Sequence, residues 1–428
     1  MKIILPEGAK VMIAQLEQKG CESYVVGGCV RDSLLQKIPY DWDICTAALP
    51  QQVCEILRDY PIIQTGLKHG TVTVLYQNTP YEVTTFRTDG EYLDHRRPKQ
   101  VAFITNLKED LARRDFTINA IAYHPKKGII DPFFGEQDLK GKCIRCVGSP
   151  KKRFEEDALR IMRALRFASV LGFKIEDQTA LAIHQQSDLL QHIAKERIQS
   201  ELCRCICGSY TADIFRAFPD VLSQFIPELT TCLHGDLWER TLISLHGAFD
   251  DCIVRLAILF YGIAKSQSSF TNDIRQQCAD ITHQIMKRLK FKNEWIHQVK
   301  QLVFWYGSDP TPDTKQIKTY LHQLGPSLFE KFIRVKQADT LWQTPEKRQA
   351  KQQQLSQVER LNQIIIQQKQ CFSLKDLAIH GTDLISLGFS GKEIGYLLNA
   401  LLQKVIQEEL ENKREVLLKF IQEKGTLC

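Results

Sequence analysis

The sequence predicts an α+β protein, with a mixed β-sheet and helices at the N-terminal end and an all-α remainder. Two observations support this prediction. Runs of alternating or β-branched residues occur early, at 70–76 and 81–87, and a short turn separates them. From about residue 178 onward, by contrast, apolar residues recur at helical spacing. The length of 428 residues is sufficient for about three domains.

Composition sets only broad limits on function. The chain is 43% hydrophobic and 25% charged, and its formal net charge of +6 permits a polyanionic partner without requiring one. The apolar run after Met1 is too short for a secretory signal, and the strongest later run, 253–263, contains Arg255. These features predict a cytoplasmic protein with reduced cysteines. Cys143 and Cys146 have the spacing of zinc ligands, but no second pair completes a tetrahedral site.

The first predicted strand, 24–26, leads into two glycines, Gly27 and Gly28, before a helix that contains Arg31 and Asp32. Because glycine has no Cβ, backbone N–H groups at such a turn can approach a phosphate closely. The N-terminus of the next helix also attracts negative charge. We therefore expect this turn to bind phosphate.

Asp41 and Asp43 are the most informative residues in the chain. On a strand, residues i and i+2 point the same way, so two carboxylates at this spacing can share divalent cations. Phosphate on one side and metal ions on the other indicate a nucleotidyltransferase with a two-metal site. An Asp-x-Asp pair alone is more often a solvated turn or a cap. The glycine turn that precedes it favours the catalytic interpretation.

The order of these elements resembles the nucleotidyltransferase superfamily that includes DNA polymerase beta. More narrowly, it resembles the class II branch of bacterial tRNA nucleotidyltransferases and poly(A) polymerases, whose first motif is Gly-Gly-x-Val-Arg-Asp followed by Asp-x-Asp. Every residue of that motif is present here. The resemblance implies a polymerase-beta-like catalytic head, Mg²⁺ held by Asp41 and Asp43, and nucleotide contacts from Gly28 and Arg31.

A hairpin is expected next, with strands at 70–76 and 81–87 and a turn at 78–80. If its second strand lies beside the strand of Asp41, Glu82 can complete the site, because deprotonating a 3′-hydroxyl requires a base or a metal nearby. In the family, a third carboxylate occupies a similar position. The alternative, an exposed strand residue, stays open because residue period does not set strand order.

Residues 89–98 contain glycine and many charges, which predicts an irregular, mobile loop beside the site. The segment resembles the flexible loop of complete CCA-adding enzymes. Family members that add only CC lack much of this loop. The resemblance therefore counts against that restricted activity, without proving addition of the terminal A.

The run 113–120, Arg-Arg-Asp-Phe-Thr-Ile-Asn-Ala, is a second motif that the family shares. Guanidinium groups stay charged and bind phosphate oxygens in a bidentate manner. The resemblance implies that Arg114 contacts the triphosphate or another part of the substrate, and that Asp115 holds an arginine in place. The run 129–139 resembles the third motif, in which we interpret Asp131 as a hinge or positioning residue rather than a metal ligand.

Residues 153–168 are good helix formers and predict one helix with Asp157, Arg160 and Arg163 on successive turns of one flank. A carboxylate beside a guanidinium can read the Watson–Crick edges of C and A without a template. A surface helix with i,i+3 salt bridges is the alternative. Resemblance to the family's Glu-Asp-x-x-Arg motif implies that Asp157 and Arg160 select the base, with Arg163 and Arg166 as neighbouring nucleotide contacts.

The C-terminal half carries two further local resemblances. The run 260–265 is similar to the metal-binding His-Asp run of HD phosphohydrolase domains, but Tyr261 and Gly262 replace that pair, so we expect no phosphodiesterase activity. Residues 373–395 resemble the C-terminal signature of bacterial CCA-adding enzymes. This implies a grip on the double-helical part of tRNA by phosphate and shape, with Lys392 as a candidate. Ordinary helix packing is the alternative.

The resemblance implies a catalytic head at 1–140, a neck for base selection at 141–205, a helical body at 206–305 and a tRNA-binding helical tail at 306–428. The expected function is template-independent addition and repair of the 3′-terminal CCA of tRNA, using CTP and ATP and releasing pyrophosphate. An A-adding tRNA nucleotidyltransferase or a poly(A) polymerase are alternatives. A non-catalytic RNA-binding protein is a remote alternative, disfavoured by the complete motifs. Neither a membrane nor a protein partner is implied.

Overall fold

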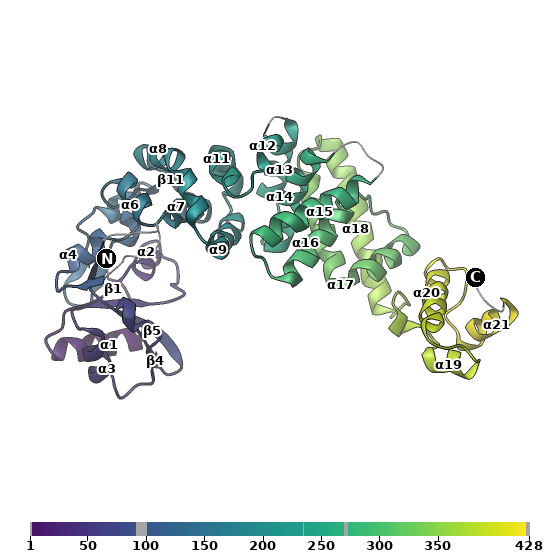
Figure 1. Ribbon diagram of the computed structural model, residues 1–428, viewed down its shortest axis with the longest axis horizontal. Helices are drawn as coiled ribbons and strands as arrows, with labels where there is room; N and C mark the ends of the chain where they lie inside the picture. The colour runs from purple at the N-terminus through teal and green to yellow at the C-terminus, as the bar shows by residue number, and fades with distance from the viewer. Residues whose placement is uncertain (1, 91–100, 234, 269–272, 425–428) are drawn as a thin grey trace. The chain divides into compact units, whose positions relative to one another are not determined.

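The structure, a computed structural model, describes residues 2–90, 101–233, 235–268 and 273–424. Contacts within the chain divide it into two compact units, residues 1–227 and 228–428. The first unit contains a mixed sheet with helices, and the second is helical in its described part (Figure 1). The predicted α+β class is confirmed, whereas the finer divisions at 140, 205 and 305 stay predictions.

The sheet of the first unit has seven strands in the order β3-β4-β5-β2-β1-β8-β9. Within the described part of this sheet, neighbouring strands are antiparallel except β2 and β5, which are parallel. The sheet is therefore mixed, as expected. The strands span Ser23–Val26 (β1), Asp43–Thr46 (β2), Ile62–Ile63 (β3), Thr71–Tyr76 (β4), Thr79–Thr85 (β5), Ala122–His124 (β8) and Gly128–Ile130 (β9).

The hairpin between β4 and β5 has a tighter turn than predicted. Gln77 and Asn78 both have positive φ angles, 49° and 63°. Two consecutive residues of this kind make the turn whose twist matches that of the strands it joins. Thr79 and Pro80 therefore already belong to β5, and the predicted turn at 78–80 lies too far along the chain.

Helices on the sheet hold its strands in place. Helix α1 (Glu7–Gln18) contacts β1 and β2, and α3 (Pro50–Ile56) contacts β4 and β5. Helix α4 (Leu107–Ala112) contributes to a hydrophobic core cluster together with the strands. This burial of apolar side chains stabilises the part of the sheet around β2, which begins at Asp43. The cluster includes Tyr24, Val26, Cys45, Phe86, Leu107 and Leu111.

The remainder of the first unit is mainly helical, with two small two-stranded sheets. Helix α7 packs against α9 and α10, and α6 packs against α8. The elements span Gly28–Leu34 (α2), Arg87–Asp89 (β6), Val101–Phe103 (β7), Gly135–Lys140 (α5), Cys143–Ile144 (β10), Pro150–Glu156 (α6), Leu159–Leu171 (α7), Lys174–Ile175 (β11), Asp177–Gln185 (α8), Lys195–Ile206 (α9), Thr211–Ala217 (α10) and Pro219–Ser223 (α11).

The single helix predicted over 153–168 is wrong: the chain forms α6 and α7 with a break at Asp157. Asp157 has extended backbone angles, φ −139° and ψ 101°, and its carboxylate accepts the backbone N–H of Leu159 at 3.1 Å. Aspartate favours such capping positions over helix interiors because its short side chain bonds nearby N–H groups. Met162 and Leu165 of α7 are buried.

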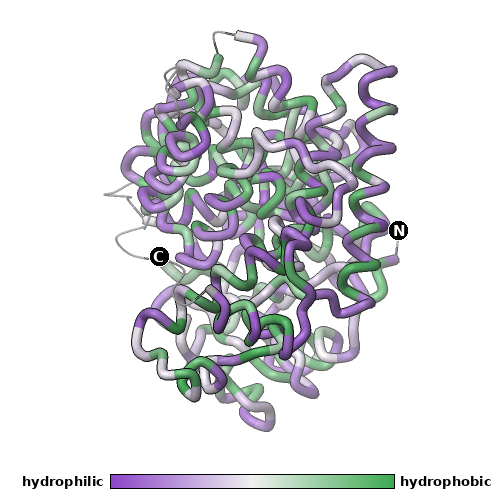
Figure 2. Tube along the Cα trace, turned by 90° about the vertical axis from the view of Figure 1, so that its right-hand side faces the viewer, coloured by the Kyte–Doolittle hydropathy of each residue, from purple (hydrophilic) through white to green (hydrophobic). Residues whose placement is uncertain are grey.

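The second unit contains helices α12 to α21 in its described part. Helix α14 is the most apolar of its central helices and contacts α13, α15, α16 and α17. Figure 2 shows hydrophobic and hydrophilic residues alternating along the helices, as amphipathic helices require. The helices span Leu229–Cys232 (α12), Asp236–His246 (α13), Cys252–Gln267 (α14), Ile274–Arg288 (α15), Asn293–Tyr306 (α16), Thr314–Asp339 (α17), Pro345–Gln367 (α18), Gly381–Ser386 (α19), Lys392–Ile406 (α20) and Arg414–Lys424 (α21).

Helices α19 to α21 share a small core of their own, which includes Leu384, Leu401 and Leu417. Helix α17 is bent where Gly325, at φ 73°, precedes Pro326. Across the described residues, no helix combines the length and apolar character needed to cross a membrane.

Candidate active site

A cavity of about 620 Å³ in the first unit gathers most of the predicted site residues. Its walls come from the turn between β1 and α2, the start of β2, the motif after α4, and the surface of α7. Of the predicted residues, Gly28, Arg31, Asp41, Asp43, Arg114, Arg163 and Arg166 line this cavity. Glu82, Asp157 and Arg160 are not among its lining residues.

The glycine turn depends on the conformation of Gly27. Its φ of 81° lies in the region that side chains disfavour, and a Cβ there would lie 3.0 Å from Nη1 of Arg114. Its N–H donates to the carbonyl of Ile121 at 3.1 Å, which ties the turn to the start of β8. Helix α2 begins directly afterwards, at Gly28. The turn therefore brings bare backbone close to an arginine.

Asp43 is the first residue of β2, Asp41 lies two residues before it, and both line the same cavity. Burial, together with the charges of Asp41 and Glu82, raises the pKa of Asp43 to about 6 against the opposing effect of Arg114. A site that crowds carboxylates in this way favours a bound cation, because positive charge relieves the repulsion.

Glu82 lies next to Asp43, because β2 and β5 are parallel neighbours and the two residues are register partners. The adjacency of the two strands, which the sequence left open, is thus present. The side chain of Glu82 is exposed and does not line the cavity. Its role as the third carboxylate stays a prediction.

The aspartate pair fits a divalent cation that the substrate helps to hold. Within the ranges that the structure describes, no cluster of three His, Cys, Asp or Glu side chains is arranged to hold a metal ion. Mg²⁺ in nucleotide enzymes is commonly held by one or two carboxylates together with substrate phosphates and water. Asp41 and Asp43 meet that requirement, and the missing ligands would come from substrate.

Arg114 is partly buried and lines the cavity. Its Nη2 lies 3.4 Å from Oδ2 of Asp110, which also binds Arg113 at 2.8 Å. Its Nε is buried without a hydrogen-bond partner among the described residues. Burial lowers the pKa of Arg114, but the charges of Asp110 and other anionic groups outweigh this and raise it overall. The guanidinium is thus a permanent, incompletely bonded donor beside the aspartates.

Arg31 is held from two sides. Its Nε donates to Asp32 at 2.8 Å, and its Nη1 donates to the side-chain oxygen of Asn119 at 2.7 Å. Asn119 in turn donates to Asp115 at 3.1 Å. The first and second motifs are therefore joined by hydrogen bonds within one cavity.

Asp115 acts as the positioning residue that the sequence predicts. Its carboxylate bonds Nη2 of Arg163 at 2.6 Å and accepts the backbone N–H of Phe116 at 2.8 Å. These contacts fix an arginine of α7 relative to the second motif. Asp131 is likewise a positioning residue, since it accepts the N–H groups of Gly135 and Glu136 at the start of α5, both at 2.8 Å.

The face of α7 that lines the cavity contains a residue that the sequence did not single out, Phe167. Three guanidinium groups lie over its ring, those of Arg31 at 5.1 Å, Arg163 at 5.4 Å and Arg166 at 4.2 Å. Burial lowers the pKa of Arg166 to about 10, against the charge of Glu201, 3.2 Å away. The sequence feature that could have identified Phe167 is its aromatic ring directly after Arg166, because arginines commonly stack on aromatic rings.

Asp157 and Arg160, the predicted base-reading pair, each bond another residue in this structure. Asp157 bonds Arg197 at 3.1 Å, and Arg160 bonds Glu156 at 2.7 Å. Arg160 is only 8% exposed and also donates to the carbonyl of Arg113 at 2.8 Å. The break between α6 and α7 sends the two side chains to different partners. Their role in base selection stays a prediction, and residues 91–98 of the predicted loop lie outside the described residues.

Comparison with known proteins identifies the family. Sequence profiles match at residues 23–145 (poly A polymerase head domain), 172–233 (probable RNA and SrmB-binding site of polymerase A) and 274–421 (putative tRNA nucleotidyltransferase domain 2). A CCA-adding enzyme of Lactobacillus helveticus is 36% identical, covering 97% of this chain and 96% of its own length. The chain belongs to the CCA-adding enzyme family. A second member, from Enterococcus faecalis, is 37% identical over 96% of this chain and 94% of its own.

Solved structures of CCA-adding enzymes agree with this assignment. The Bacillus stearothermophilus enzyme, crystallised in complex with CTP, has 30% identity and a TM-score of 0.79, covering 98% of each chain. The Thermotoga maritima enzyme complexed with tRNA-CCA has a TM-score of 0.61 over 99% of this chain and 97% of its own, and at 20% identity it supports the fold alone. As a member of the CCA-adding enzyme family, the chain is a nucleotidyltransferase, and such enzymes typically use a divalent metal.

Proposed function

We propose that this protein adds and repairs the 3′-terminal CCA of tRNA without a template, using CTP and ATP and releasing pyrophosphate. The observation that carries the proposal is the single cavity whose lining includes Asp41, Asp43, the glycine turn and five arginines. Carboxylates on one side and guanidinium groups on the other suit a metal-bound triphosphate. The reaction takes place in the cytoplasm, where tRNA is matured.

In this proposal Asp41 and Asp43 hold Mg²⁺, which, when bound, lowers the pKa of the primer 3′-hydroxyl and neutralises triphosphate charge. Asp43 must be ionised to do so. Its pKa of about 6 allows this near neutral pH, and a bound cation would lower that pKa further. Glu82 would receive the hydroxyl proton or orient the primer, and its register pairing with Asp43 supports this role.

The triphosphate binds between the glycine turn and the arginines. Arg114 supplies a guanidinium whose Nε has no other partner among the described residues. Arg31 is pre-oriented by Asp32 and Asn119, which reduces the entropy lost when it binds phosphate. Phosphate oxygens thus meet donors already directed at them, and the pyrophosphate leaves in line with the attacking hydroxyl.

Selection between C and A requires donors and acceptors supplied by the protein itself. Asp157 and Arg160 offer both, provided that each exchanges its present partner, Arg197 or Glu156, for the nucleobase. Arg163 and Arg166 line the cavity next to this pair along α7 and supply further nucleotide contacts. Helices α19 to α21, with Lys392 at the start of α20, are the proposed contact to the double-helical part of tRNA.

The test uses purified protein, Mg²⁺ and three tRNA transcripts that lack CCA, end in C or end in CC, with CTP and ATP supplied separately and together. We expect completion of CCA on all three and arrest after A. Extension of the CC-ending substrate alone would identify an A-adding enzyme, and long A tails a poly(A) polymerase. An Asp41→Ala variant that still incorporates nucleotides would overturn the assignment of the site.

A further inference from the structure

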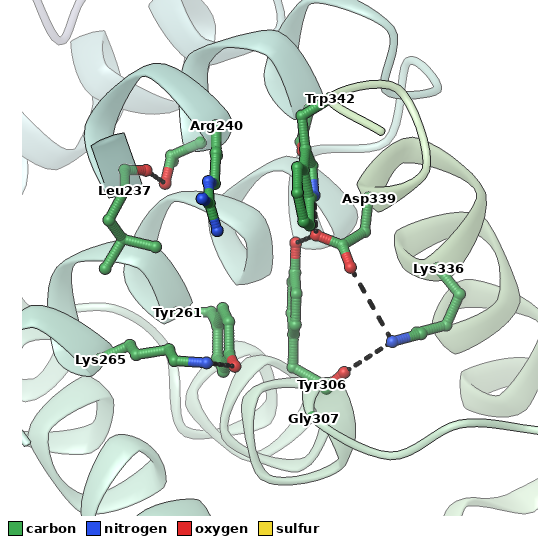
Figure 3. A pocket seen from close by; sticks show the side chains of 11 residues that line it. Leu237, Arg240, Tyr261, Lys265, Tyr306, Gly307, Lys336, Asp339 and Trp342 are labelled. Carbon is green, nitrogen blue, oxygen red and sulfur yellow. Dashed lines mark hydrogen bonds and ion pairs between the residues drawn. The ribbon is translucent and has the colours of Figure 1, made fainter. Parts of the chain in front are cut away.

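A second cavity, of about 240 Å³, lies within the helical second unit and contains none of the residues assigned above (Figure 3). Its walls come from α13, α14, α16 and α17 together with the residues that directly follow α16 and α17. It includes Tyr261, from the run where an HD domain would have its metal-binding pair. The cavity is therefore a feature that nucleotide transfer leaves unexplained.

The floor of this cavity is a buried polar network. The ring of Tyr306 stacks on that of Tyr261 with centroids 3.7 Å apart, and its hydroxyl donates to Oδ1 of Asp339 at 2.9 Å. The indole N–H of Trp342 donates to the same oxygen at 3.3 Å. These two donors occupy one oxygen of Asp339 and fix its orientation, as Figure 3 shows.

Lys336 completes the network beneath the cavity. It is only 8% exposed, and its Nζ donates to the carbonyl of Tyr306 at 2.9 Å and lies 3.9 Å from Asp339. Burial lowers the pKa of Lys336, because the charge of Asp339 only partly offsets the desolvation of the ammonium group. Ser244, also buried in the lining, lies beside Tyr306, but its hydroxyl makes no hydrogen bond of good geometry within the described residues.

The mouth of the cavity carries two further cations on aromatic faces. The Arg240 guanidinium lies 4.5 Å from the Trp342 ring, and its only ion-pair partner among the described residues, Asp236, is 3.9 Å away and 91% exposed. Lys265 donates to the hydroxyl of Tyr261 at 3.1 Å and has no carboxylate partner in the part of the chain that the structure describes. Figure 3 shows both side chains facing the same space.

Close packing of two helices brings these cations together. A Cβ on Gly262 would collide with the hydroxyl of Thr241, the residue after Arg240. Glycine at this position therefore lets α14 approach α13 closely, so that Arg240 and Lys265 lie across a narrow mouth. Glycine at position 262 is therefore explained by the close contact between α13 and α14, which both line the cavity.

We propose that this cavity binds a small phosphoanion, such as inorganic phosphate or pyrophosphate. Arg240, Lys265 and Lys336 outnumber the single carboxylate Asp339 by two charges, which matches a dianion. Planar guanidinium donors suit phosphate oxygens, and the Ser244 hydroxyl in the lining offers a further donor. A volume of about 240 Å³ lies below the range usual for drug-sized ligands, which selects a small anion over a whole nucleotide.

The test reads tryptophan fluorescence in the full-length Trp42→Phe protein, which removes the indole beside the active site and keeps Trp342 among its four remaining tryptophans. Titration with phosphate or pyrophosphate, against potassium chloride at equal ionic strength, should give a saturable change. The change should disappear in Trp342→Phe and require at least tenfold more anion in Arg240→Ala and in Lys265→Gln. Lys287→Ala, an exposed lysine of α15 outside the cavity, is the matched control and should leave the titration unchanged.

Three outcomes would overturn the proposal. A change that chloride reproduces would mean general ionic screening, and one that persists in both Arg240→Ala and Lys265→Gln would mean binding elsewhere. A response to tRNA but to neither free anion would assign the cations to RNA backbone phosphates. Circular dichroism melts of each variant check folding. None of these readouts depends on nucleotide incorporation, so failure here and failure of the proposed function are distinguishable.

Discussion

Asp115 and Arg163 form an ion pair of 2.6 Å between residues 48 positions apart in the chain. The pair joins the Arg-Arg-Asp motif to the helix that carries the nucleotide-facing arginines. Burial by itself raises the pKa of Asp115, but the charge of Arg163 and the hydrogen bonds from Asn119 and Arg163 hold that pKa well below its ordinary value. The folded protein therefore depends on an ionised carboxylate at this point.

Asp115→Ala should lower the free energy of unfolding by about 2–3 kcal/mol near neutral pH, because it leaves a guanidinium without its buried partner. The loss of stability is smaller than for a fully buried ion pair, because the Arg163 side chain is 33% exposed and solvent screens its charge. Since the folded-state pKa is depressed, the contribution is present above the ordinary pKa of 3.8 and is lost as pH falls further. Urea unfolding at neutral and acid pH measures both effects.

Asp177→Ala is the matched control, because Asp177 pairs with Lys174 in full contact with solvent. We expect no measurable change in its unfolding at either pH. Equal stability of Asp115→Ala and the wild type would contradict a structural role for the Asp115–Arg163 pair.

Asp43→Asn should stabilise the metal-free protein at pH 8 by about 2–3 kcal/mol while abolishing nucleotide addition. The wild-type carboxyl has a folded-state pKa of about 6 against an ordinary 3.8, so the destabilisation of the folded protein grows as pH rises from 3.8 and is complete above 6. At pH 3 the difference between the variant and the wild type should nearly vanish, since the wild-type carboxyl is then protonated in both the folded and the unfolded states. Thermal unfolding in a chelator at the two pH values measures the difference.

The carboxyl of Asp43 also predicts that Mg²⁺ changes the thermal stability of the protein. Mg²⁺ should raise the unfolding temperature of the wild type at pH 8, because it relieves the repulsion among Asp41, Asp43 and Glu82. At pH 5 the cation must displace a proton, so the rise should shrink. An equal rise in Asp43→Asn would place the metal elsewhere.

Local pattern predicted the parts of the site that depend on local geometry. The glycine pair predicted the turn at Gly27, and the i, i+2 spacing predicted that Asp41 and Asp43 share a cavity, although only Asp43 is in the strand. Local pattern failed at Asp157. Helix propensity summed over 153–168 favoured one helix, but Asp157 is extended and its carboxylate accepts the N–H of Leu159, so the chain forms two helices. Partners such as Arg197 for Asp157 come from another helix, and only tertiary packing determines them.

Asp157→Ala should change the ratio of CTP to ATP incorporation on a CC-ending tRNA, because it removes the acceptor of the proposed base-reading pair. Arg197→Ala leaves that carboxylate in place and only frees it from its present partner, so it should preserve the order of C and A addition. Single-nucleotide incorporation with each triphosphate measures the ratio. If both variants keep the wild-type ratio, Asp157 does not read the base.

Phe167→Leu should raise KM for CTP and ATP together, by about 5–30-fold, because its ring supports three guanidinium groups that line the nucleotide cavity. Each cation–π contact contributes about 0.5–1 kcal/mol at a partly exposed site, and leucine keeps the apolar bulk without the π face. Arginines that lose this support must be ordered by the nucleotide itself, which weakens binding of any triphosphate.

Phe173→Leu controls for loss of aromatic volume, since Phe173 is also buried but does not line the cavity. It should leave both KM values unchanged. A Phe167→Leu enzyme with an altered CTP-to-ATP ratio and normal KM for one of them would mean that the ring contacts the base rather than the arginines. Equal loss for both nucleotides, with kcat preserved, is the result expected of a residue that holds Arg31, Arg163 and Arg166 in position for the triphosphate.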